Sequence, residues 1–142
     1  MLATNEACSL PAQPESLPHL HEVMARFWAS VEAVRGHRVP SHIRHGLATA
    51  VAEVGANIIR HSQAKSFDFI LVLRDEDTVE ARFEDAGVPF GAVPYGEFDP
   101  HMLPEGGMGL TLAKRALHAL EYRRLPNGTN CWTLVVLLPV SK

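Results

Sequence analysis

Three polar residues at four-residue spacing, Glu53, Asn57 and His61, interrupt a segment that is otherwise apolar. Residues four apart share one face of a helix, so a carboxylate, an amide and an imidazole would lie along one stripe. Such a stripe can place a hard cation such as Mg²⁺ through oxygen ligands, or orient a hydroxyl for proton abstraction. Solvated helix faces carry the same residue types, so a surface stripe is the alternative interpretation.

A second candidate is Asp85, which directly follows an alternating apolar segment and stands two residues before Gly87. A carboxylate at the end of a strand can accept a hydrogen bond from an exocyclic amine. A glycine beside it lets a flat ring approach the bare backbone. Aspartate and glycine also form turns, so an ordinary turn is the alternative here.

A glycine-rich stretch, residues 106–109 (GGMG), precedes a segment with helical spacing. Glycines there allow unusual backbone angles, and the N-terminus of a helix offers unpaired N–H groups to an anion. The stretch has neither the lysine-bearing P-loop pattern nor the glycine fingerprint of dinucleotide-binding folds. It therefore predicts either an anion-binding turn or a flexible connection into the helix.

The elements that must position these residues follow from the apolar spacing. Helical spacing predicts three helices, at about residues 15–35, 41–61 and 108–120. Alternation predicts an edge strand and two hairpins, at residues 7–12, 66–84 and 121–138, the last around an Asn127-Gly128 turn. Hairpins with helices in a separate layer indicate an α+β fold. We expect a two-layer α/β sandwich whose mixed sheet is mostly antiparallel, with the helices on one face.

Composition narrows the class of protein. The chain has 142 residues, 46% hydrophobic and 20% charged, which is typical of one globular domain spanning residues 1–142. The net charge of −3 argues against a duplex DNA binder, so we expect no direct nucleic-acid partner. No apolar run suits a membrane span or a secretion signal. The two distant cysteines, Cys8 and Cys131, are expected to be free thiols in the cytoplasm.

In order, these features resemble the GHKL family, the histidine-kinase-like ATPase domains. The N-box of that family resembles residues 53–61 (EVGANIIRH), and its first glycine box resembles residues 85–90 (DAGVPF). The second glycine box resembles residues 107–110 (GMGL). Gly128-Thr129 stands where the family has a threonine beside the adenine pocket. The resemblance covers about residues 7–140, and within the family it is greatest to the small stand-alone bacterial anti-sigma factor serine kinases.

This resemblance implies ATP and Mg²⁺ as cofactors and suggests a role for each motif residue. Asn57 would hold Mg²⁺ against the phosphates, Asp85 would accept from the adenine amino group, and Gly87 would let the ring pack closely. Glu53 would be the general base for a protein serine hydroxyl. Residues 88–106 would form the ATP lid. The remaining nucleotide contacts would be His61, Gly107, Met108, Gly109, Leu110 and Thr129.

The implied function is an anti-sigma factor that binds a sigma factor in one state. In another state it would phosphorylate a STAS-type anti-anti-sigma protein. Relatives often dimerise, so a homodimer is open as well, with Phe27-Trp28 on the first helix as one candidate contact. The family often has threonine where this chain has Ala56, and some members have a basic residue where it has Glu105-Gly106. A carboxylate at that place would repel a γ-phosphate.

Two other functions therefore stay open. The first is a non-catalytic module that binds nucleotide and sequesters a sigma factor or another regulator. The second is the catalytic domain of a two-component histidine kinase acting in trans, although the sequence shows no helical hairpin with a phospho-accepting histidine.

Overall fold

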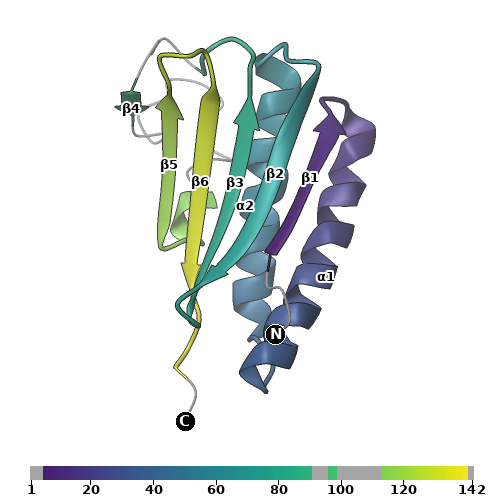
Figure 1. Ribbon diagram of the computed structural model, residues 1–142, viewed down its shortest axis with the longest axis vertical. Helices are drawn as coiled ribbons and strands as arrows, with labels where there is room; N and C mark the ends of the chain where they lie inside the picture. Colours follow the sequence, from purple (N-terminus) through teal and green to yellow (C-terminus); the bar gives the residue numbers. More distant parts are fainter. Residues whose placement is uncertain (1–4, 91–95, 99–112, 141–142) are drawn as a thin grey trace.

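The two predicted layers are present in the computed structural model, which describes residues 5–90, 96–98 and 113–140. A single turn of 3₁₀ helix, η1 (Pro14–Ser16), leads into α1 (Leu17–Arg35), and α2 (Ser41–His61) follows. Both long helices lie on one face of the sheet, with α1 beside the β1 side and α2 behind the middle (Figure 1). The α+β two-layer prediction is therefore confirmed.

The sheet is antiparallel at every strand pairing that the structure describes. Its strands are β1 (Asn5–Pro11), β2 (Ser66–Arg74), β3 (Thr78–Asp85), β4 (Gly96–Phe98), β5 (Ala119–Arg124) and β6 (Asn130–Leu137). Their order across the sheet is β1-β2-β3-β6-β5-β4, which makes β1 an edge strand as predicted. All five neighbouring pairs run antiparallel. The predicted antiparallel character is therefore present, and the described strands include no parallel pair.

The core lies between the helices and the inner face of the sheet. Alternate residues of each central strand point inward, as the period of two requires, and the helices contribute one apolar stripe each. The largest of these fully buried side chains are Trp132, Tyr122, Phe27, Phe67, Phe69 and Phe83. Burial of this apolar surface fixes which face of β3 and β6 looks toward α2.

Two parts of the chain differ from the sequence prediction. The long Pro- and Gly-rich loop contains β4, which pairs with β5 from Gly96 to Phe98. The third helix was predicted to reach Leu120, but residues 113–115 are helical and β5 already begins at Ala119. Ala119 pairs with Val135 of β6. The pairing with β6 prevails over the local helical spacing. A periodicity count could not predict it, because the partner residue is 16 positions away in the sequence.

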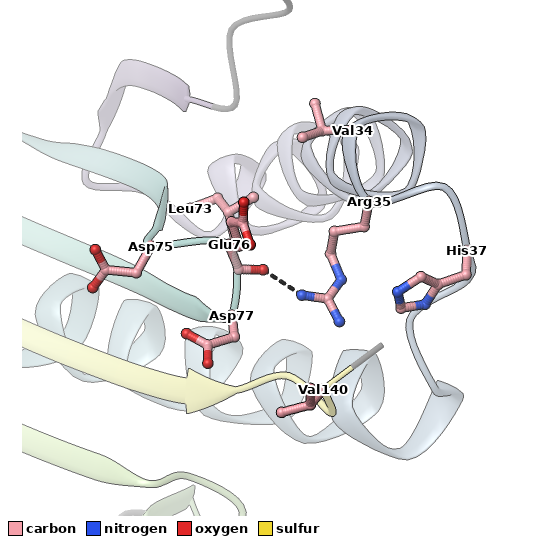
Figure 2. Close-up of a pocket in the computed structure, with 8 residues that line it drawn as sticks. All are labelled: Val34, Arg35, His37, Leu73, Asp75, Glu76, Asp77 and Val140. Atoms are coloured by element: carbon pink, nitrogen blue, oxygen red, sulfur yellow. Dashed lines mark hydrogen bonds between the residues drawn. The ribbon is translucent and has the colours of Figure 1, made fainter. Parts of the chain in front are cut away.

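The end of the molecule that holds the β2–β3 turn is tied together by Arg35. Its guanidinium donates to the backbone carbonyls of Glu76 in the turn and of Pro139 after β6. Figure 2 shows this side chain beside a cavity of about 450 Å³ that the turn and Val140 also line. Because Arg35 already donates to two backbone carbonyls, we interpret it as a structural residue that stabilises this end of the fold. Among the described residues, no helix is long and apolar enough to cross a membrane.

Candidate functional site

Three buried polar residues meet near the C-terminal end of α2. At this place β3 ends and its neighbour β6 begins. Asn57 lies in the last half of α2, Asp85 is the last residue of β3, and Asn130 is the first residue of β6. These residues are 3%, 5% and 2% exposed, respectively. Asp85 and Asn130 face each other because they are partners in the β3–β6 register. All three line one small cavity, so the fold brings the first two predicted motifs together.

Asp85 has one satisfied oxygen and one unsatisfied oxygen. Its Oδ1 accepts hydrogen bonds from the Gly87 amide at 2.8 Å and from Asn130 Nδ2 at 2.9 Å. Its Oδ2 is buried and has no hydrogen-bond partner among the described residues. Burial raises the pKa of this carboxyl. Hydrogen bonding from Asn130, Gly87 and the nearby Ser62 hydroxyl, together with the charge of Arg124, opposes the rise. A buried acceptor without a donor is costly, so Oδ2 marks a place where a ligand could donate.

Gly87 is required by a close approach of two backbones. A Cβ at this position would lie 2.1 Å from the carbonyl oxygen of Ser62, which follows α2. The next amide, that of Val88, donates to the same Ser62 carbonyl at 2.6 Å. The segment after β3 is therefore packed directly on the C-terminal end of α2, and this contact sets the position of Asp85 relative to Asn57.

The predicted stripe on α2 is present, but its members differ in surroundings. Asn57 Nδ2 donates to the backbone carbonyl of Glu53 at 2.9 Å, and Arg60 Nη2 lies 3.4 Å from Asn57 Oδ1. His61 is exposed, and its ring lies edge-on to Phe90 with centroids 6.4 Å apart. Asn57 and His61 line the cavity beside Asp85, whereas Glu53 is half-buried one turn away and does not line it.

Thr129 lies in the turn before β6, and its neighbour Asn130 is the residue beside Asp85. The Thr129 amide donates to Asn127 Oδ1 at 3.1 Å, and the residue lines a second groove, of about 540 Å³, which Asp85, Lys65 and Asp68 also line. Sequence reasoning missed Asn130. A signal was available, because Asn130 is in phase with the inward-facing residues of β6, where an apolar side chain is the norm.

Asn130 is the centre of a hydrogen-bond network that joins three strands. Its Oδ1 accepts from Arg124 Nη1 at 3.0 Å and from the Tyr122 hydroxyl, both on β5. Its Nδ2 donates to Asp85 and also to the Val88 carbonyl at 2.9 Å. Arg124 further donates to the Gly87 carbonyl at 2.6 Å. Burial raises the pKa of Tyr122, so its hydroxyl keeps the proton that it donates.

The second glycine box cannot be placed. Gly107, Met108, Gly109 and Leu110 lie outside the described residues, as do Glu105 and most of the expected lid at residues 88–106. In the part of the chain that is described, no group of three or more His, Cys, Asp or Glu side chains could hold a metal ion.

We expect that Gly87→Ala disrupts this site and destabilises the fold by about 2–3 kcal/mol, because a backbone carbonyl cannot move aside as a side chain can. Urea denaturation followed by circular dichroism would measure the change. Gly55→Ala on α2 is the matched control, since its Cβ would meet Leu20 and Leu17 methyl groups at 3.1 and 3.3 Å. The control should stay within about 1 kcal/mol of the wild type. Equal stability of all three proteins would contradict the close approach.

The raised pKa of Asp85 predicts a pH-dependent cost. The folded state holds this proton more tightly than the unfolded state, whose pKa is near the ordinary 3.8. Stability contributed by the protonated form is therefore lost as pH rises from about 3.8 to the folded pKa. Asp85→Asn should unfold at a higher temperature than the wild type at pH 7, and the gap should close toward pH 3. A gap that widens on acidification would refute this sign.

The comparisons with known proteins agree with this geometry. The sequence matches the family described as histidine kinase-like ATPase domain over residues 10–135. No curated protein matches it significantly.

A structure of the RsbU and RsbW domains of Rv1364c from Mycobacterium tuberculosis is similar, with a TM-score of 0.67 and 14% identity. The match covers 97% of this chain but 34% of that one, so this chain spans about a third of its length. A blue-light-activated histidine kinase from Erythrobacter litoralis EL346 has a similar kinase domain, with a TM-score of 0.54 and 13% identity over 96% of this chain and 69% of that one. At these identities the likeness shows the fold. Because the family match covers most of the chain, the protein belongs to the histidine kinase-like ATPase domain family.

Proposed function

We propose that this domain binds ATP with Mg²⁺ and transfers the γ-phosphoryl group to a serine of a partner protein. The partner is a STAS-type anti-anti-sigma protein, and in another state the domain sequesters a sigma factor. One observation carries the nucleotide part of the proposal, namely that the buried Asp85 Oδ2 has no hydrogen-bond donor among the residues that the structure describes. An ionised carboxylate oxygen in this position suits the exocyclic amine of adenine.

The surroundings of Asp85 suit a flat base. Gly87 has no side chain beside the carboxylate, and its backbone is held against Ser62. Asn130 donates to Oδ1 and leaves Oδ2 without a donor among the described residues, and Asp85 lines a cavity with Asn57 and Trp132. The base would therefore meet one hydrogen-bond acceptor in a fixed position. Such a preorganised acceptor gives specificity, and little conformational entropy is lost when the ligand binds.

Asn57 supports the phosphate part of the proposal. Because its Nδ2 bonds the Glu53 carbonyl, its Oδ1 is the atom turned away from the helix backbone. Oδ1 accepts a hydrogen bond from Arg60 Nη2 at 3.4 Å, which a bound cation would replace. Mg²⁺ can take such an oxygen as a ligand and draw its other ligands from phosphates and water, so a single protein ligand fits this ion. When bound, Mg²⁺ would neutralise charge on the phosphates. Glu53, on the same helix face, has a carboxylate that can accept the proton of a serine hydroxyl.

The choice of partner rests on the resemblance of the three motifs to anti-sigma factor serine kinases. The fold shared with a chain that contains RsbU and RsbW domains agrees with it. Ala56 and Glu105 depart from the motif pattern, so phosphoryl transfer needs its own experiment beside nucleotide binding.

Calorimetric titration of ATP with Mg²⁺ should show binding to the wild type. The Asp85→Asn variant should bind about 10- to 100-fold more weakly, because a hydrogen bond to a charged acceptor is lost. Asp75→Asn, an exposed carboxylate on the β2–β3 turn, is the control and should bind as the wild type does. Equal affinity of the Asp85 variant and the wild type would remove Asp85 from the site.

Transfer is tested with radiolabelled ATP and a STAS-domain protein. Glu53→Gln should keep its affinity for ATP and lose transfer by about 10²- to 10⁴-fold, since a general base contributes that much. Glu22→Gln, an exposed residue on α1, should transfer as the wild type does. A wild-type protein that binds ATP but phosphorylates no STAS partner would favour the non-catalytic binding module.

A further inference from the structure

The cavity that Asp85 lines together with Asn57 has almost no free volume in this structure. Its volume is about 10 Å³, although nine residues line it, from α2, Ser62 after α2, β3, the segment after β3, and β6. A single water needs about 10–15 Å³, and pockets for small organic ligands measure roughly 300–1,000 Å³. A nucleotide base therefore cannot enter this cavity until a side chain moves. Phe90, one of the lining residues, is the side chain best placed to do so.

Phe90 packs into an aromatic cluster with Tyr122 and Trp132. Its ring centroid lies 4.9 Å from that of Trp132 and 5.9 Å from that of Tyr122, at interplanar angles of 69° and 60°. These edge-to-face contacts are favourable arrangements for aromatic rings. Tyr122 and Trp132 are fully buried strand residues, whereas Phe90 is half-buried in the segment that follows β3. Phe90 is therefore the member of the cluster that can leave without disturbing the sheet.

A hydrogen bond from β5 holds Phe90 in place. The Phe90 amide donates to the Tyr122 hydroxyl at 2.8 Å, and the same hydroxyl donates to Asn130 Oδ1. Asn130 in turn donates to the bonded oxygen of Asp85. One hydroxyl thus connects Phe90, which lines the cavity, to the Asn130–Asp85 pair.

We propose that Tyr122 is a positioning residue that holds Phe90 over the base pocket, so that nucleotide binds only after the Phe90 ring withdraws. The proposal rests on the proposed function, which assigns this pocket to a nucleotide. Withdrawal breaks the Phe90–Tyr122 hydrogen bond and the edge contacts. The apparent dissociation constant then exceeds the intrinsic one by the reciprocal of the open fraction.

Tyr122→Phe is the most selective variant, because it removes the hydroxyl and keeps the buried ring. Asn130 Oδ1 retains its bond from Arg124, so the Asp85–Asn130 pair keeps a support from β5. Phe90→Ala removes the ring itself. Both variants should increase the open fraction, and loss of one neutral hydrogen bond corresponds to about a fivefold change in that equilibrium.

The experiment has one readout without nucleotide and one with it. The chain contains two tryptophans, so a Trp28→Phe background leaves Trp132, which contacts Phe90, as the reporter. Acrylamide quenching of Trp132 in the absence of nucleotide measures how open the cluster is. Stopped-flow mixing with ATP and Mg²⁺, followed by the same fluorescence, measures the association rate. Val31→Ala on α1, beside β1 and away from β5, controls for general loosening of the core (Figure 1).

Both Tyr122→Phe and Phe90→Ala should raise Trp132 quenching and should associate with nucleotide about fivefold faster than the parent, while Val31→Ala should do neither. Weaker or unchanged nucleotide binding by Phe90→Ala in a parent that binds ATP would overturn the proposal, because the ring would then support the base. Unchanged quenching in Tyr122→Phe would overturn it as well. Raised quenching in both variants with no nucleotide bound by any protein would refute the proposed function and leave the closing role of Phe90 standing.

Discussion

The carboxylate of Asp85 lies at the end of β3 and is buried, since only 5% of the residue is exposed. A buried charge is costly in free energy unless its oxygens accept hydrogen bonds. The protein supplies those bonds to Oδ1 and none from the described residues to Oδ2. The raised pKa of this group reflects the remaining cost. Such a site lowers the stability of the folded protein but provides a hydrogen-bond acceptor in a fixed position. The surrounding residues hold that acceptor in place.

The register of the central strands does most of this work. Asp85 and Asn130 are paired residues of β3 and β6, so the same backbone ladder that builds the sheet also aligns carboxylate and amide. Arg124 on β5 donates hydrogen bonds to Asn130 Oδ1 and to the Gly87 carbonyl, and these bonds hold the segment after β3 in place. The approach of Gly87 to Ser62 then joins this unit to α2 and to Asn57.

The opposite end of the molecule has a different character. Asp75 and Glu76 adopt positive φ angles of 60° and 89° in the β2–β3 turn, a conformation that costs non-glycine residues about 1 kcal/mol or more each. The Arg35 guanidinium bonds the Glu76 carbonyl there, as Figure 2 shows. This end contains a cavity of about 450 Å³, whereas Asp85 lines a groove of about 540 Å³ at the other end.

The sequence by itself determined the local elements and the residues whose chemistry needs only local spacing. Both long helices, both hairpins and the edge strand follow from apolar periodicity, and the shared face of Asn57 and His61 follows from their four-residue separation. The tertiary structure alone decided what surrounds Asp85. Asn130 and Tyr122 enter the site through strand pairing and packing between residues up to 45 positions apart, and no local pattern encodes such a pairing. The same reason explains β4 and the early start of β5, where a distant strand partner prevails over local preference.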